Sequence, residues 1–151
     1  MKLSVIAMMM IAACAASSGT KPVEPWRIDV TTSGGLAGRG NGSFAIDSAG
    51  QVTVTTMAGR SCTYQATDAE RARFTELLTN ARPDSWAEHY KPENDCCDRF
   101  QYDLTLDEAG KQTKTMWIDD PAPMPNDLAA LVDAITGAGN SLRVVYQSQC
   151  Q

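Results

Sequence analysis

Apolar and polar residues alternate along two stretches of the chain, and both stretches predict β-strands. Trp26, Ile28 and Val30 alternate with polar residues, and the same period of two runs through residues 100–106. Such alternation is typical of a strand with one face toward a core and the other toward water. Further strands are predicted at residues 43–46, 51–57 and 112–118, because turn sequences at 47–50 and 107–110 join them to their neighbours.

Two segments have the period of an amphipathic helix. The first begins at residues 67–70, where Thr67 and Glu70 form a capping box, and Pro83 ends it after an apolar stripe of Phe74, Leu77, Leu78 and Ala81. The second ends at Gly137 and presents one apolar face, formed by Leu128, Leu131, Val132 and Ile135.

The order of these elements predicts the fold class. A turn of helix around Trp86 and an edge strand at residues 142–146 complete the expected elements. We predict an α+β fold, with an antiparallel four- to five-stranded sheet and two helices packed on one face.

The first residues have the pattern of an export signal. Lys2 precedes an apolar run that is too short to span a bilayer, and small residues follow it. The run ends in Ile11-Ala12-Ala13-Cys14, which resembles the lipobox of bacterial lipoproteins, whose cysteine receives the lipid. The alternative is ordinary cleavage after residues 13–15, which would release a soluble periplasmic or secreted protein.

These features divide the chain into three parts. Residues 1–13 are the predicted lipoprotein signal peptide, residues 14–25 are the lipidated Cys14 and its tether, and residues 26–151 form a single domain. By its resemblance to sorted lipoproteins, the chain is expected in the cell envelope, held by lipid in the outer membrane and facing the periplasm.

The charge of the mature chain disfavours anionic partners. Removal of Lys2 with the signal leaves 12 of the 13 Lys and Arg residues against 18 Asp and Glu, a net charge of −6. Nucleic acids and anionic lipids select for clustered basic residues. We therefore predict no nucleic-acid partner, and membrane attachment only through the lipid on Cys14.

Four cysteines remain for the mature domain, namely Cys62, Cys96, Cys97 and Cys150. An even number in an exported protein predicts disulfides, with three possible pairings. A bond between the adjacent Cys96 and Cys97 would close a strained ring. We therefore expect each of these two to reach a distant partner, one bonding Cys62 and the other Cys150.

Catalytic residues are hard to find in this sequence. His89 is the only histidine and has no nucleophile motif around it. A metal site with Asp95, Cys96, Cys97 and Asp98 is disfavoured, because adjacent cysteines lack the two-residue gap that lets both sulfurs face one zinc ion. The acidic pairs 107–108 and 119–120 sit at turns and are interpreted as caps or solvated faces. We predict no enzymatic activity, no cofactor and no metal.

The opening strand leads into a glycine-rich segment suited to being bound. It consists of Ser33, Gly34, Gly35, Leu36, Ala37 and Gly38. Glycine lets the backbone take positive φ and lie close to another surface, so Leu36 is the one large side chain on offer. The alternative interpretation is that the glycines only turn a hairpin. A phosphate loop is rejected, since no strand-to-helix transition follows.

Residues 28–38, together with the order of the elements that follow, resemble the emfourin family. Its members are small proteinaceous inhibitors of thermolysin-like zinc metalloproteases of the M4 type. The resemblance covers roughly residues 27–135 and is most specific at 33–38; the export signal and the four mature cysteines depart from it. It implies that an M4-type metalloprotease is the partner, with Leu36 filling the pocket just after the scissile bond while the loop backbone occupies the cleft uncut.

The competing interpretation is an envelope lipoprotein that binds an unknown ligand without inhibiting a protease. Its ligand surface would be aromatic, built from Trp26, Trp86, Trp117 and nearby tyrosines. Aromatic residues at such positions more often pack in a core.

Overall fold

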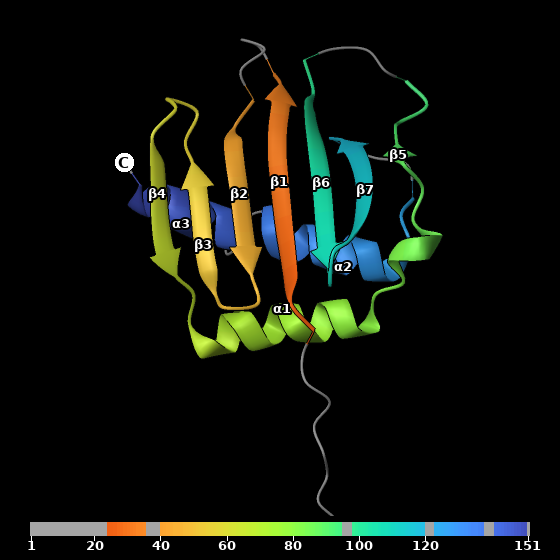
Figure 1. Cartoon of the computed structure of the whole chain (residues 1–151). Coiled ribbons are helices and arrows are strands. Elements are labelled where there is room, and N and C mark those ends of the chain that lie inside the picture. Colours follow the sequence, from red (N-terminus) through yellow and green to blue (C-terminus); the bar gives the residue numbers. More distant parts are fainter. Residues whose placement is uncertain (1–23, 36–39, 95–97, 120–122, 138–140, 151) are drawn as a thin grey trace, which may run out of the picture.

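The structure is a computed structural model that describes residues 24–35, 40–94, 98–119, 123–137 and 141–150. These residues contain seven strands and three α-helices. The strands form one sheet in the order β4-β3-β2-β1-β6-β7-β5 (Figure 1). Their bounds are β1 Trp26–Gly34, β2 Gly42–Asp47, β3 Gln51–Thr55, β4 Ser61–Gln65, β5 His89–Tyr90, β6 Phe100–Glu108 and β7 Lys111–Ile118. The helices are α1 Asp68–Asn80, the short 3-10 helix η1 Pro83–Ser85, α2 Asn126–Thr136 and α3 Leu142–Gln149.

The α+β class is confirmed, but the predicted composition of the sheet and of the helix layer is wrong. The sheet has seven strands instead of four or five, and it is mixed, because β5 runs parallel to β7 while all other pairs are antiparallel. Three α-helices are present instead of two. β4 and β5 were not predicted, because both are short sheet-edge strands and each is buried on one side at most.

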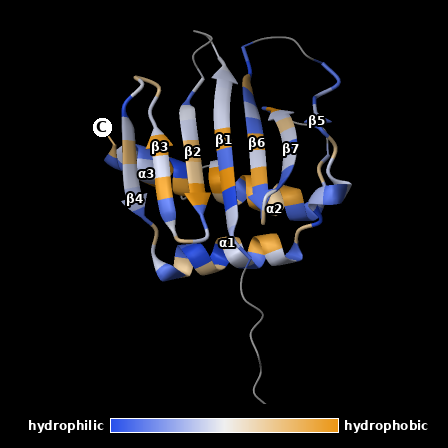
Figure 2. Cartoon of the chain, in the orientation of Figure 1, coloured by the Kyte–Doolittle hydropathy of each residue, from blue (hydrophilic) through white to orange (hydrophobic). Residues whose placement is uncertain are grey.

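The alternation in the sequence corresponds to the two faces of the sheet. Ile28 of β1 lies opposite Ile46 of β2 and Leu106 of β6, and all three are fully buried. The intervening positions, such as Arg27 and Asp29, belong to the opposite face. Figure 2 shows this alternation of hydrophilic and hydrophobic residues along the central strands. One face of the sheet therefore carries the core.

The helices cover that core. In Figure 1, α2 and α3 lie behind the sheet and α1 runs along the lower end of the strands. The predicted capping box of α1 is present, with Glu70 N–H donating to the Thr67 hydroxyl at 3.2 Å and Thr67 N–H donating to the Glu70 carboxylate at 2.8 Å. Phe74 of α1 stacks on Trp26 with 6.5 Å between ring centroids. In α2, the predicted face is buried through Leu128, Leu131 and Ile135, whereas Val132 is only partly buried.

Residues 142–146 form the start of helix α3, so the predicted edge strand is wrong. A strand would place Leu142, Val144 and Tyr146 on one face, but Val144 is 41% exposed while Leu142, Arg143 and Tyr146 are buried. The buried positions follow the helical period, because α3 lies against the core face and not beside the last strand.

Tyr146 links α3 to α1. Its hydroxyl donates to the Glu70 carboxylate at 3.0 Å. Burial and this hydrogen bond raise the pKa of Tyr146 to about 12. Burial acts to raise the pKa of Glu70 as well, but the hydrogen bonds from Thr67 and Tyr146 outweigh it, and the pKa of Glu70 is lowered. The N-terminus of α1 and the middle of α3 are therefore held together by a charge-assisted hydrogen bond.

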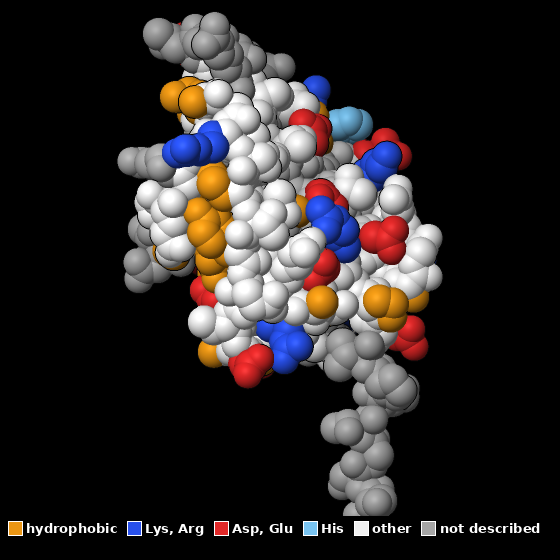
Figure 3. Space-filling view, turned by 60° about the vertical axis from the view of Figure 1, so that its left-hand side comes forward, with side chains coloured by type: hydrophobic (Ala, Val, Ile, Leu, Met, Phe, Trp, Pro, Cys, Tyr) orange, Lys and Arg blue, Asp and Glu red, His pale blue; other side chains and the backbone are white. Residues whose placement is uncertain are grey.

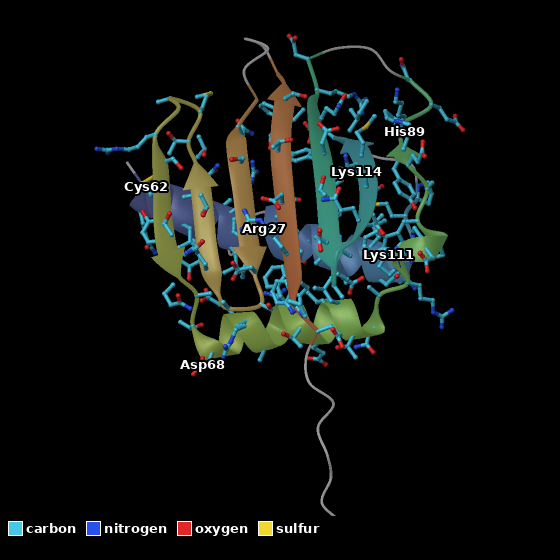
Figure 4. The ribbon with its side chains drawn as sticks, in the orientation of Figure 1. Arg27, Cys62, Asp68, His89, Lys111 and Lys114 are labelled. Atoms are coloured by element: carbon cyan, nitrogen blue, oxygen red, sulfur yellow. A yellow bond between two sulfur atoms is a disulfide. The ribbon has the colours of Figure 1, made fainter. Side chains whose placement is uncertain are left out.

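The predicted disulfide pairing is also wrong. Cys62 of β4 bonds to Cys150, which follows the last residue of α3, and their Cα atoms are 5.8 Å apart (Figure 4). Neither is therefore free to bond Cys96 or Cys97. The physical reason is that α3 brings the C-terminus beside the edge strand β4, which no local pattern indicates. Cys96 and Cys97 themselves lie outside the described residues.

Two further predictions fall outside these residues. The signal peptide, Cys14 and most of the tether precede residue 24. No helix in the described ranges has the length and apolar character that crossing a bilayer requires.

Candidate functional site

The glycine-rich segment leaves the middle of the sheet. β1 is paired on both sides, and its last ladder contacts are Thr32 with Gly42 of β2 and Gly34 with Phe100 of β6. Residues 35–41 therefore connect the two strands of a β1–β2 hairpin. The glycine-rich segment does turn a hairpin, as the alternative interpretation says, and a hairpin loop of this kind can also bind a partner. Of the predicted binding residues, Ser33, Gly34 and Gly35 are described. Leu36, Ala37 and Gly38 lie outside the described residues.

Both ends of this loop are held by backbone hydrogen bonds. Gly35 N–H donates to the carbonyl of Arg99 at 3.0 Å, which ties the loop to the segment before β6. Gly40 N–H donates to the carbonyl of Gly34 at 2.9 Å, which ties the two arms of the loop together. The loop therefore starts and ends at fixed backbone positions.

Glycine is required here by close backbone contacts as well as by dihedral angle. Gly40 has φ +62°, and a Cβ added there would lie 1.8 Å from the carbonyl oxygen of Thr32. Gly42 has φ +85°, and its Cβ would lie 1.8 Å from the carbonyl oxygen of Thr55. Both contacts involve backbone atoms of paired strands, which cannot move aside without breaking the ladder. The sequence indicated glycine flexibility; the structure shows that these positions are tightly packed.

Gly42→Ala is expected to lower the free energy of unfolding by about 3 kcal/mol, because it combines a left-handed dihedral with a backbone clash. Gly59 is the matched control. Its φ is +83°, and no atom lies within 4 Å of an added Cβ. Gly59→Ala should cost only about 1 kcal/mol, the dihedral strain alone. Urea denaturation of the two variants measures the difference, and equal losses would show that the packing at Gly42 is unimportant.

Helix α3 supports the loop from the core side. Gln147 Nε2 donates to the carbonyl of Asn41 at 2.8 Å and to the carbonyl of Thr55 at 3.1 Å. The Cys62–Cys150 disulfide fixes the end of the same helix. This support by α3 is not among the predictions from the sequence. Leu142 and Tyr146, four residues apart after Ser141, were the signal for a helix.

A buried arginine lies on the core side of the same end of the sheet. Arg143 is only 7% exposed, and its guanidinium carbon lies 5.7 Å from the centroid of the Tyr102 ring. Within the described part of the chain, five buried side-chain polar atoms make no hydrogen bond, namely Trp26 Nε1, Thr32 Oγ1, Ser141 Oγ, and Arg143 Nε and Nη1. Burial and the charge of Asp119 raise the pKa of Tyr102, although Arg143 acts in the opposite direction.

The three tryptophans belong to the core. Trp26, Trp86 and Trp117 are 5%, 9% and 3% exposed. Trp86 Nε1 donates to the carboxylate of Asp127 at 3.0 Å, which docks η1 on α2. These three side chains are therefore too buried to form an exposed aromatic surface, although Trp117 lines a hollow beside α2.

His89 lies in β5, paired with Met116 of β7 (Figure 4). It lines a depression of about 630 Å³ together with Asp103 and Lys114. Of the other residues of the disfavoured metal site, Asp95, Cys96 and Cys97 lie outside the described residues, and Asp98 is exposed. Among the residues that the structure covers, no three His, Cys, Asp or Glu side chains are arranged to hold a metal ion.

Two of the acidic residues at the turns accept hydrogen bonds from backbone N–H groups. Asp107 accepts a hydrogen bond from Gly110 N–H at 2.9 Å. Asp119 accepts one from Phe100 N–H at 2.9 Å, next to the base of the glycine loop.

Hydrophobic side chains reach the surface along the β4 side of the molecule. Met57 is 64% exposed and Val144 is 41% exposed, while Cys62 and Tyr64 of β4 are partly buried. Figure 3 brings this side forward and shows a narrow hydrophobic band among polar side chains. Met57 and Val144 line a hollow of about 360 Å³ that also includes Asn41, beside the returning arm of the glycine loop.

The described geometry thus presents one loop on a rigid base. Comparisons of the chain with protein-family models, with curated proteins and with solved structures gave no match.

Proposed function

We propose that the protein inhibits thermolysin-like M4 zinc metalloproteases and presents its inhibitory loop, residues 33–38, from the cell envelope. The observation that supports this most directly is the base of the loop. It leaves a strand that is paired on both sides, and its two arms are closed by the hydrogen bonds of Gly35 and Gly40.

A fixed base matters because an inhibitor must bind like a substrate and resist cleavage. Ordering a flexible loop on binding costs free energy for each residue that loses its freedom. Here the loop ends are already ordered by β1, β2 and α3, so a larger share of the contact energy remains for binding. A clamped loop also keeps the scissile segment from relaxing into the geometry that hydrolysis needs.

The test is inhibition of thermolysin, measured with a short peptide substrate. We expect inhibition in the micromolar range or tighter, with the chain recovered uncut by mass spectrometry after prolonged incubation. A serine protease such as trypsin serves as the control for general effects on the assay. If several M4 enzymes are unaffected, the inhibitor proposal fails and a non-inhibitory binding role replaces it.

The lipid on Cys14 is proposed separately. We expect intact-mass analysis of a membrane fraction to show a chain that begins at Cys14 and carries acyl groups, and Cys14→Ala should release the protein from that fraction. A chain that begins after residue 15 without lipid would contradict this and support ordinary signal cleavage.

A further inference from the structure

A second hollow lies behind the upper end of the sheet, between the end of β7 and helix α2. Its volume is about 420 Å³. Tyr102 and Trp117 are among its lining residues, and their largely buried rings stack on each other with 5.1 Å between ring centroids and 5° between ring planes. We call this hollow the aromatic pocket. Its size falls within the range of roughly 300–1,000 Å³ that is common for small-ligand sites.

The walls of the aromatic pocket are apolar. Pro123 and Met124 form one side, and Ala129 and Val132 of α2 form the other. Apolar walls beside aromatic side chains favour an apolar or aromatic group.

The charged residues that line the pocket are both acidic. They are Asp119, at the end of β7, and Asp133 of α2, and no Lys or Arg is among the described lining residues. Asp133 is exposed. Asp119 accepts the Phe100 N–H on Oδ2 and its carboxylate also interacts with the Tyr102 hydroxyl, so Asp133 is the carboxylate that is open to a ligand.

Two arginines lie nearby without lining the pocket. Arg99 Nη1 donates to the backbone carbonyl of Asp119 at 2.7 Å. Arg143 lies over the Tyr102 ring, and it lines the separate hollow beside Met57.

We propose that the aromatic pocket binds an organic cation, that is, an apolar or aromatic group carrying an ammonium or guanidinium. The apolar part would lie against the apolar walls beside Tyr102 and Trp117, and the cation would be held by the exposed carboxylate of Asp133, with the charge of Asp119 nearby. A carboxylate holds such a cation through charge-assisted hydrogen bonds. This inference does not depend on the inhibitor proposal, because the pocket lies outside the glycine loop.

The test compares two probes of matched size, 2-phenylethylamine and 3-phenylpropionate, titrated into the purified protein at pH 7 by calorimetry and by tryptophan fluorescence. The amine should bind with a Kd on the order of 1 mM or below, and at least about tenfold more tightly than the carboxylate. Equal binding of the two probes, or no binding of the amine, would overturn the proposal.

Two α2 variants locate the binding site. Ala129 and Ala130 are both exposed residues of α2, but only Ala129 lines the pocket. Ala129→Phe should fill the pocket and abolish amine binding, whereas Ala130→Phe should leave it unchanged. Thermal melts of both variants confirm that each is folded. Binding that survives Ala129→Phe would place the amine elsewhere and overturn the assignment.

Charge and ligand source are tested with one further variant and one further probe. Asp133→Asn should weaken amine binding by about tenfold while leaving phenylpropionate binding no weaker; an unchanged amine affinity would remove the carboxylate from the proposal.

Nα-acetyllysine methylamide represents a basic side chain of a partner protein. If it binds more tightly than phenylethylamine, the ligand is a peptide side chain, and the reverse order indicates a free amine.

Discussion

Leu36→Asp is expected to abolish inhibition of an M4 protease, raising the inhibition constant by about 100-fold or more. The substitution would place a carboxylate where the enzyme pocket takes a bulky apolar side chain, and burying that charge unpaired carries a large desolvation cost. The measurement is the inhibition constant against thermolysin, taken beside the melting temperature of the variant.

The melting temperature separates a binding role from a structural one. The last ladder contact of β1 is Gly34 with Phe100, so the sheet is complete before residue 36. We therefore expect the variant to melt within a few degrees of the parent chain. Leu36→Met keeps an apolar side chain of similar volume and should retain most of the inhibition. Loss of inhibition together with a large drop in melting temperature would contradict the proposal, because Leu36 would then belong to the core.

Removing the disulfide with Cys62→Ala and Cys150→Ala together is expected to lower the free energy of unfolding by about 4 kcal/mol. The two cysteines are separated by 88 positions in the sequence, and the loss of unfolded-chain entropy grows with the length of the loop that a crosslink closes. Urea denaturation of the double variant measures the effect. Using both substitutions avoids leaving one free thiol that can form mixed disulfides.

The same variant reports on the loop. The disulfide fixes the end of α3, and Gln147 of α3 donates to Asn41 and Thr55 beside the loop base. If α3 supports the loop, inhibition by the double variant should weaken several-fold under conditions where the chain remains folded. Gln147→Leu is the matched change, since it removes both hydrogen bonds and leaves the disulfide intact. A double variant as stable as the parent would mean that α3 is held without the crosslink.

The elements that sequence reasoning predicted correctly are those with a local cause. The alternation in β1 and β6 follows from the two faces of a strand, and the capping box of α1 involves only Thr67 and Glu70. The hairpin turns at 47–50 and 107–110 depend on residues next to one another. Such patterns are complete within a few positions, so they can be recognised without knowing where the rest of the chain lies.

The wrong predictions concern elements whose conformation depends on distant partners. Residues 142–146 fit both an alternating and a helical pattern. They form a helix because α3 packs on the core face of the sheet. β4 is a short edge strand whose partner β3 lies on one side only. The disulfide pairing followed from the meeting of β4 with the C-terminus, which counting cysteines cannot reveal.

The candidate site divides in the same way. The residue types of the loop were visible in the sequence, since glycines around one leucine indicate a segment that can be bound. The exclusion of any side chain at Gly40 and Gly42 depends on the carbonyl groups of Thr32 and Thr55, so it appears only when the strands are paired. The aromatic pocket likewise needs β6, β7 and α2 together.

The sequence by itself determined which residues face the core along β1 and β6, where α1 begins, and which segment offers a lone leucine between glycines. Only the tertiary structure decided the number of strands, the partner of Cys62, the support of the loop by α3, and the aromatic pocket. The physical reason is range: side-chain periodicity and capping act over a few residues, whereas packing, crosslinking and pocket formation join residues that are far apart in the chain.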